Sequence, residues 1–127
     1  MDFSVFKNEE HAEALAAHLS ITSQDEVDEL VETGDEHYGL PVFDYDGEQF
    51  AVGTGDEAND AKREAVQEYI DECVLPEIPK QYRQYFDDSA FTNDCTNDEL
   101  VGLIGSYDGC ELVQKTKCRY YYIYQLS

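Results

Sequence analysis

The chain has 127 residues, 42% of them hydrophobic and 13% aromatic, which is enough to bury the core of a small domain and excludes an acidic disordered tail. Its 29 acidic residues outnumber its 8 basic residues, for a formal net charge of −21 at pH 7. Such a charge repels nucleic acid and anionic membranes, so we expect neither as a direct partner and expect a basic protein surface instead.

Two short helices are predicted near the start of the chain. Asn8 can cap the first, which runs to about Leu19 because apolar residues recur there at helical spacing. Ser23 and Glu26 form the S-x-x-E pattern of a capping box ahead of the second helix, and Gly34 is expected to end it.

A hairpin follows these helices. The segments Leu40–Tyr45 and Glu48–Val52 are rich in β-branched and aromatic residues, and Asp46-Gly47 between them is a strong two-residue turn signal. Because proline cannot donate a ladder hydrogen bond, Pro41 predicts that the first strand lies at a sheet edge.

The longest predicted helix begins after Thr54, which forms a second capping box with Glu57. It is expected to reach about Cys73, and Pro76 and Pro79 prevent it from continuing. Its predicted buried stripe is Ala58, Ala61, Ala65, Tyr69 and Cys73, with Val66 and Ile70 beside it.

The two prolines divide the chain into an acidic lobe, residues 1–78, and a smaller lobe, residues 79–127. The smaller lobe is predicted to hold a short helix, a polar loop at Asp87–Asp94 and a further capped helix beginning after Thr96. Two strands joined by a basic loop close the chain, roughly Cys110–Gln114 and Cys118–Gln125. The expected fold class is α+β, with helices packed on short antiparallel hairpins.

The cysteines do not have the spacing of a metal site, because no C-x-x-C pair is present. We expect free and mostly buried thiols in a reducing compartment, and neither metal nor cofactor; the four are Cys73, Cys95, Cys110 and Cys118. No run of about 18 apolar residues and no basic, apolar leader occurs, which predicts a cytosolic protein.

One stretch resembles a known pattern. It runs from Tyr38 to Ala58 with the sequence YGLPVFDYDGEQFAVGTGDEA and continues into the long helix. This pattern is similar to one found in small acidic proteins of tailed bacteriophages, which are largely uncharacterised. The resemblance implies a phage setting and carries over no catalytic residue. In charge and size the chain is also similar to phage inhibitors that mimic DNA, a likeness of composition alone.

The long helix carries a row of acidic residues four apart: Asp56, Asp60, Glu64, Glu68 and Glu72. Each step advances about 6 Å along the axis. Like charges at this spacing destabilise a helix, and a solvated helix normally interleaves bases. One interpretation is that the row imitates a strand of phosphates. The other is a solvent face on a generally acidic protein.

The charge is concentrated in one part of the chain. Residues 1–79 hold 22 acidic and 3 basic residues, whereas residues 80–127 hold 7 and 5. A halophilic protein should be acidic throughout, so this asymmetry disfavours that explanation. Besides the row, a second acidic patch precedes the hairpin and comprises Asp25, Glu26, Asp28, Glu29, Glu32, Asp35 and Glu36.

The last strand is rich in tyrosine. At strand period Tyr120, Tyr122 and Tyr124 share one face, and Tyr121 and Ile123 share the other, so one set should pack and the other should be exposed. Bases mixed with aromatics also suit single-strand binders, but this lobe has too few bases. We expect exposed tyrosines here to anchor a protein partner.

Other motifs are weak. Asp44–Gly47 resembles the front of a calcium loop but lacks the later ligands, so a hairpin turn explains it better. His11 and His18 are two helical turns apart, too far to bind one ion. Gly53–Gly55 lacks the lysine of a phosphate loop. We therefore do not expect an enzyme.

Together these features predict a phage-encoded inhibitor in the host cytoplasm. It binds a basic, nucleic-acid-handling host defence protein, of the anti-CRISPR or anti-restriction type, by imitating the DNA phosphate backbone. The expected contact residues are Asp25, Asp28, Glu29, Glu32, Asp56, Asp60, Glu64, Glu68, Glu72, Tyr120, Tyr122 and Tyr124. The alternatives are a phage accessory or structural protein whose acidity serves only solubility, and a halophilic protein or small enzyme.

Overall fold

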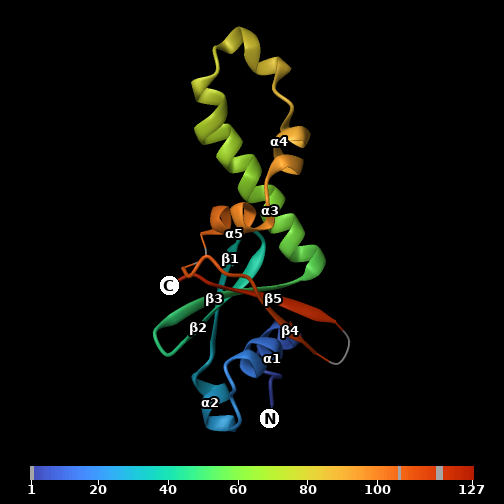
Figure 1. Ribbon diagram of the computed structural model, residues 1–127. Helices are drawn as coiled ribbons and strands as arrows, with labels where there is room; N and C mark the ends of the chain where they lie inside the picture. Colours follow the sequence, from blue (N-terminus) through green and yellow to red (C-terminus); the bar gives the residue numbers. More distant parts are fainter. Residues whose placement is uncertain (1, 106, 117–118) are drawn as a thin grey trace.

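A five-stranded antiparallel sheet forms the centre of the molecule, with helices on both faces (Figure 1). The computed structural model describes residues 2–105, 107–116 and 119–127. The strand order is β1-β2-β3-β5-β4, and the bounds are Val31–His37 (β1), Leu40–Tyr45 (β2), Glu48–Thr54 (β3), Leu112–Lys115 (β4) and Tyr120–Gln125 (β5). The expected α+β class is confirmed.

Two short helices, α1 (Glu9–His18) and α2 (Gln24–Glu29), lead into the sheet. Asn8 stands at the N-cap position of α1, but its side chain makes no capping hydrogen bond, so that expected cap is wrong. The Ser23 hydroxyl does cap α2, because it accepts a hydrogen bond from the backbone N–H of Glu26.

Strand β1 occupies the segment in which the second helix was expected to continue to Gly34. Helix α2 stops at Glu29, Leu30 is extended and buried, and Val31 begins the strand. Gly34 has a φ of 81° and lies where the register between β1 and β2 shifts, so it marks an irregularity in the ladder and not a helix end. Pairing with β2 overrides the local helical pattern because tertiary contacts outweigh propensity.

The predicted hairpin of β2 and β3 is confirmed. Asp46 and Gly47 form its turn with φ values of 50° and 78°, the left-handed conformations that a tight hairpin turn requires. Pro41 does not place β2 at an edge, because the unforeseen strand β1 pairs with the other side of β2. The edges of the sheet are β1 and β4.

Each face of the sheet holds a hydrophobic core. On one face α1 and α2 pack over a cluster that includes Phe43 and Tyr121. On the other face α3 (Gly55–Tyr69) and α5 (Asn97–Ile104) pack over a cluster that includes Tyr124. Strand β5 therefore has buried side chains on both of its faces.

Helix α3 begins with the predicted capping box. The Thr54 hydroxyl accepts a hydrogen bond from the backbone N–H of Glu57, and the Glu57 carboxylate accepts one from that of Thr54. The helix continues into a π-helical turn, η1 (Ile70–Val74). This turn changes the helical phase, and Cys73 is exposed where burial was expected. Cys110 is also exposed, so mostly buried thiols are a wrong prediction for the described cysteines.

Residues 70–95 form an arm that projects from the body of the molecule (Figure 1). After η1 the arm contains η2 (Leu75–Glu77), η3 (Lys80–Tyr85) and α4 (Asp88–Asp94). No residue from 71 to 100 is buried. Aromatic contacts hold the two sides of the arm together. The ring centroid of Phe91 lies 6.2 Å from that of Tyr69 and 5.8 Å from that of Phe86. Tyr69 is therefore part of this half-exposed cluster and not of the predicted buried stripe.

The predicted polar loop at Asp87–Asp94 is wrong, because this segment forms α4. The Asp87 carboxylate caps the helix by accepting a hydrogen bond from the backbone N–H of Ala90 at 3.0 Å. The segment has no buried residue, so it lacks the apolar stripe by which helices are recognised in a sequence.

The sheet does not follow the expected boundary between residues 1–78 and 79–127. Strand β5 pairs with β3, and the core under α3 and α5 contains residues from both segments. Two predicted features lie outside the described residues. They are Lys117, which belongs to the predicted basic loop, and Cys118, which is the fourth predicted thiol.

Candidate partner-binding surface

All five residues of the predicted acidic row are exposed on α3 and η1: Asp56, Asp60, Glu64, Glu68 and Glu72. The opposite side of α3 is made of small residues, and Ala58, Ala61 and Ala65 are buried against the sheet. Packing of this alanine stripe directs the row to solvent. The capping box at the start of α3 fixes where the helix begins.

Few cations neutralise the row. The guanidinium of Arg63 lies 3.3 Å from the carboxylate of Asp60, but both side chains are largely exposed, so this ion pair contributes little. Among the described residues, no cation forms an ion pair with Glu64, Glu68 or Glu72. Their negative charge is therefore not neutralised by an ion pair within these residues.

The nearby cation Lys62 faces the interior. Its ammonium lies 2.7 Å from the Glu111 carboxylate and donates to the side chain of Asn97 at 2.8 Å. Only 10% of the Lys62 side chain and 13% of the Glu111 side chain are exposed. The hydroxyl of Tyr124 also donates to Glu111. We call these four residues the clasp; it joins α3 and α5 to the sheet.

The pKa of Glu111 reflects two opposed effects. Burial acts to raise it, but hydrogen bonds from Lys62 and Tyr124, together with the Lys62 charge, hold the pKa below the ordinary value. The carboxylate is therefore charged in the folded protein at neutral pH, and it neutralises Lys62 locally. This pairing removes from the surface one of the three bases among residues 1–79.

Tyr38, in the turn between β1 and β2, lies beside the acidic row. Its pKa is raised by burial, by the negative charge of Glu68 and a hydrogen bond to that carboxylate, and by the charges of Glu72 and Glu64. His37 holds this turn in place, because its imidazole hydrogen-bonds to the carbonyl of Ile104 in α5. The end of the row thus passes close to the edge strand.

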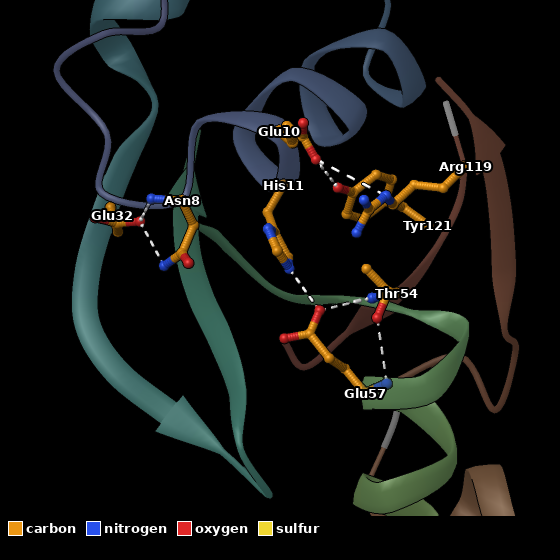
Figure 2. Close-up of polar contacts among 8 residues, drawn as sticks. All are labelled: Asn8, Glu10, His11, Glu32, Thr54, Glu57, Arg119 and Tyr121. Atoms are coloured by element: carbon orange, nitrogen blue, oxygen red, sulfur yellow. Dashed lines mark hydrogen bonds and ion pairs between the residues drawn. The ribbon is translucent and has the colours of Figure 1, made fainter. Parts of the chain in front are cut away.

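The second acidic patch is only partly available. Asp25, Asp28 and Glu29 are exposed on α2. Glu32, in β1, is engaged within the protein, since its carboxylate accepts hydrogen bonds from the backbone N–H and the side-chain amide of Asn8, both at 3.1 Å (Figure 2). It also accepts one from the backbone N–H of Lys7 at 3.0 Å. Burial acts to raise the Glu32 pKa, but these hydrogen bonds and the Lys7 charge lower it overall.

The two acidic patches do not form one surface. Helix α2 lies on one side of the sheet and α3 on the other (Figure 1). The exposed residues Asp35 and Glu36 lie on the edge strand β1 between them. A partner that binds the row would therefore contact α2 only if it also extended past the β1 edge of the sheet.

A polar cluster links α1, α3 and β5 at the base of the row (Figure 2). The imidazole of His11 lies 2.8 Å from the Glu57 carboxylate oxygen that also accepts from the Thr54 backbone at 2.9 Å. The Tyr121 hydroxyl donates to Glu10 at 2.7 Å. The His11 contact ties α1 to the capped start of α3, and the Tyr121 contact ties α1 to β5.

Each acid of this cluster has a bonding role within the fold. Burial acts to raise the Glu57 pKa, but hydrogen bonds from Thr54 and His11 lower it overall. Burial and the Glu10 carboxylate raise the pKa of Tyr121 to about 12, so its hydroxyl remains a donor at neutral pH. The cluster acts as a latch that orients α3.

The C-terminal tyrosines differ from the prediction. Tyr120 is 54% exposed, Tyr122 is half-buried, and Tyr124 is 0% exposed. The expectation that one face of this strand is exposed is wrong because helices cover both faces of β5. Tyr124 therefore cannot anchor a partner at the surface. Large exposed rings lie instead on the arm, at Tyr82 and Tyr85.

Among the described residues, no group of three or more His, Cys, Asp and Glu side chains is arranged to hold a metal ion. Within the same residues, every helix is too short or too polar to cross a bilayer. Comparison with protein-family models, with curated proteins and with solved structures finds no match for this chain.

Proposed function

We propose that this protein is a phage-encoded inhibitor that acts in the host cytoplasm on a basic, nucleic-acid-handling host defence protein of the anti-CRISPR or anti-restriction type. The single observation that carries the proposal is the row on α3: five exposed carboxylates with one weak ion pair among the described residues. The row spans about 24 Å. It offers a line of negative charge to a groove that normally holds phosphates.

The mechanism is competition for that groove. A groove lined with Lys and Arg attracts any line of anions, and rigid anions lose less entropy on binding than flexible ones. Helix α3 is held in a fixed orientation by its capping box, by the packing of the alanine stripe and by the polar cluster at its start (Figure 2). The partner's groove then holds carboxylates, and nucleic acid is excluded.

The phage setting rests on the Tyr38–Ala58 pattern. This stretch forms β2, β3 and the capped start of α3. The segment that resembles phage proteins is therefore the one that supports the row. The proposal includes no catalytic step.

Capture from a host lysate on the immobilised protein tests the proposal. We expect the captured proteins to be basic, to lose nucleic-acid binding when the inhibitor is present, and to elute as salt is raised, because electrostatic attraction is screened. A captured protein that still binds nucleic acid in the complex, or whose affinity is flat with salt, contradicts the mechanism. Failure to capture any basic protein would favour an accessory protein whose acidity serves solubility.

A further inference from the structure

The tip of the arm differs chemically from the rest of the molecule. Residues 78–86, which we call the arm tip, contain no acidic residue and two bases, Lys80 and Arg83. Two large rings are exposed there, Tyr82 at 56% and Tyr85 at 76%. An aromatic, cationic tip therefore lies at the far end of the arm, which continues from α3, the helix that carries most of the acidic row (Figure 1).

The arm tip has a defined local structure. The Arg83 guanidinium donates to the carbonyl of Ile78 at 2.9 Å, and η3 follows Pro79 directly. Phe86 joins the arm tip to the aromatic cluster on Phe91. Tyr82 and Tyr85 are thus held on a short helical turn, and exposed tyrosines held in this way are typical anchors of protein interfaces.

The charge density of the row indicates which kind of groove suits the arm. The row has one charge per about 6 Å of axis. Double-stranded DNA has one charge per about 1.7 Å of axis when both strands are counted, and one per about 3.4 Å along each strand. The charge spacing of the row is therefore nearer to that of one strand than to that of the duplex.

Proteins that hold single strands combine two features, a positive groove for the backbone and aromatic side chains on which bases stack. Helix α3 and the arm together present counterparts of both, a line of carboxylates and two exposed rings. Resting on the proposed function, we propose that α3 and the arm occupy a single-strand nucleic-acid channel, and that Tyr82 and Tyr85 stack on the channel's aromatic side chains in place of bases.

A displacement assay tests this inference. The probes are a panel of purified OB-fold single-strand-binding proteins loaded with fluorescent oligothymidylate, and a panel of nucleoid-type proteins loaded with fluorescent duplex DNA. We expect the protein to displace oligothymidylate at concentrations about tenfold or more below those needed for the duplex. Equal displacement of both, or preferential displacement of the duplex, overturns the inference.

Variants of the arm tip provide a second, independent test. We expect Tyr82→Ala/Tyr85→Ala to weaken displacement of oligothymidylate about tenfold or more at an unchanged melting temperature. Tyr82→Phe/Tyr85→Phe keeps the rings and should displace as the unmodified protein does. Tyr107→Ala removes an exposed ring outside the arm and should have no effect. Unchanged displacement by the double alanine variant overturns the inference.

The outcomes separate the inference from the proposed function. If Glu64→Gln/Glu68→Gln loses displacement while the tyrosine variants do not, the row competes but the arm tip does not stack. If neither probe is displaced by any form, the inference is overturned, and the lysate capture decides the proposed function separately. If the tyrosine variants change the sedimentation of the protein alone and not displacement, the arm tip binds a second copy of this chain, which overturns the inference.

Discussion

The Lys62→Met variant is expected to lose about 3–5 kcal/mol of folding free energy, because it leaves the charge of Glu111 buried without its partner. The side chains of Lys62 and Glu111 are mostly buried, and their charged groups lie 2.7 Å apart. Methionine matches the stem of lysine in size, so the loss should report the charge and not a cavity. Urea denaturation of the two proteins measures the difference.

The double variant Lys62→Met/Glu111→Gln is the control. Removing both charges should recover most of the stability, because the cost comes from an unpaired charge. The low pKa of Glu111 predicts a pH dependence as well. Its contribution to stability is present above the ordinary glutamate pKa of 4.5 and is lost as the pH falls through the lower pKa of the folded protein. Equal losses in the single and double variants would show that the clasp is not held by charge.

Tyr124→Ala is expected to cost about 3–5 kcal/mol, because it empties the volume of a large, fully buried ring in the core under α3 and α5. The change also removes the hydroxyl that donates to Glu111. Because Tyr124 and Lys62 share the clasp, their effects should not add. Tyr120→Ala should stay within about 0.5 kcal/mol, since the Tyr120 side chain lies largely in solvent.

Thermal unfolding of the two tyrosine variants distinguishes the roles. A collapsed melting temperature for Tyr124→Ala with an unchanged one for Tyr120→Ala agrees with the structure. Similar, small changes in both would mean that β5 is not covered on both faces.

The parts of the fold that could be predicted depend on local signals. The Asp46-Gly47 turn and the capping residues Ser23, Thr54 and Thr96 work through neighbouring backbone groups, so their effects are visible in the sequence. Strand β1 could not be predicted, because the preceding segment has a helical pattern and the strand exists through its pairing with β2. The wrong prediction that Pro41 lies on an edge strand follows from the missed strand β1.

In the candidate site, too, features that depend on local sequence could be predicted and features that depend on distant segments could not. Exposure of the row follows from the alanine stripe on the other side of α3, which is a matter of helical period. Burial of Tyr124 depends on α3 and α5 covering the second face of the sheet, and the engagement of Glu32 depends on Asn8, 24 residues away. The sequence predicts the short helix after Pro79 that carries Tyr82 and Tyr85, but the exposure of these rings could not be predicted, because it depends on how the arm projects from the sheet and its helices.

The measurement that tests the proposed competition most directly compares two variants with the same change in net charge. Glu64→Gln/Glu68→Gln/Glu72→Gln neutralises three charges of the row, and Glu9→Gln/Glu13→Gln/Glu48→Gln neutralises three exposed charges elsewhere. The readout is the concentration of each that releases half of the nucleic acid from a captured host protein. We expect the row variant to need about tenfold more protein than the control variant, because only the row enters the groove. Equal concentrations for the two variants would contradict a role for the row and leave net charge as the cause.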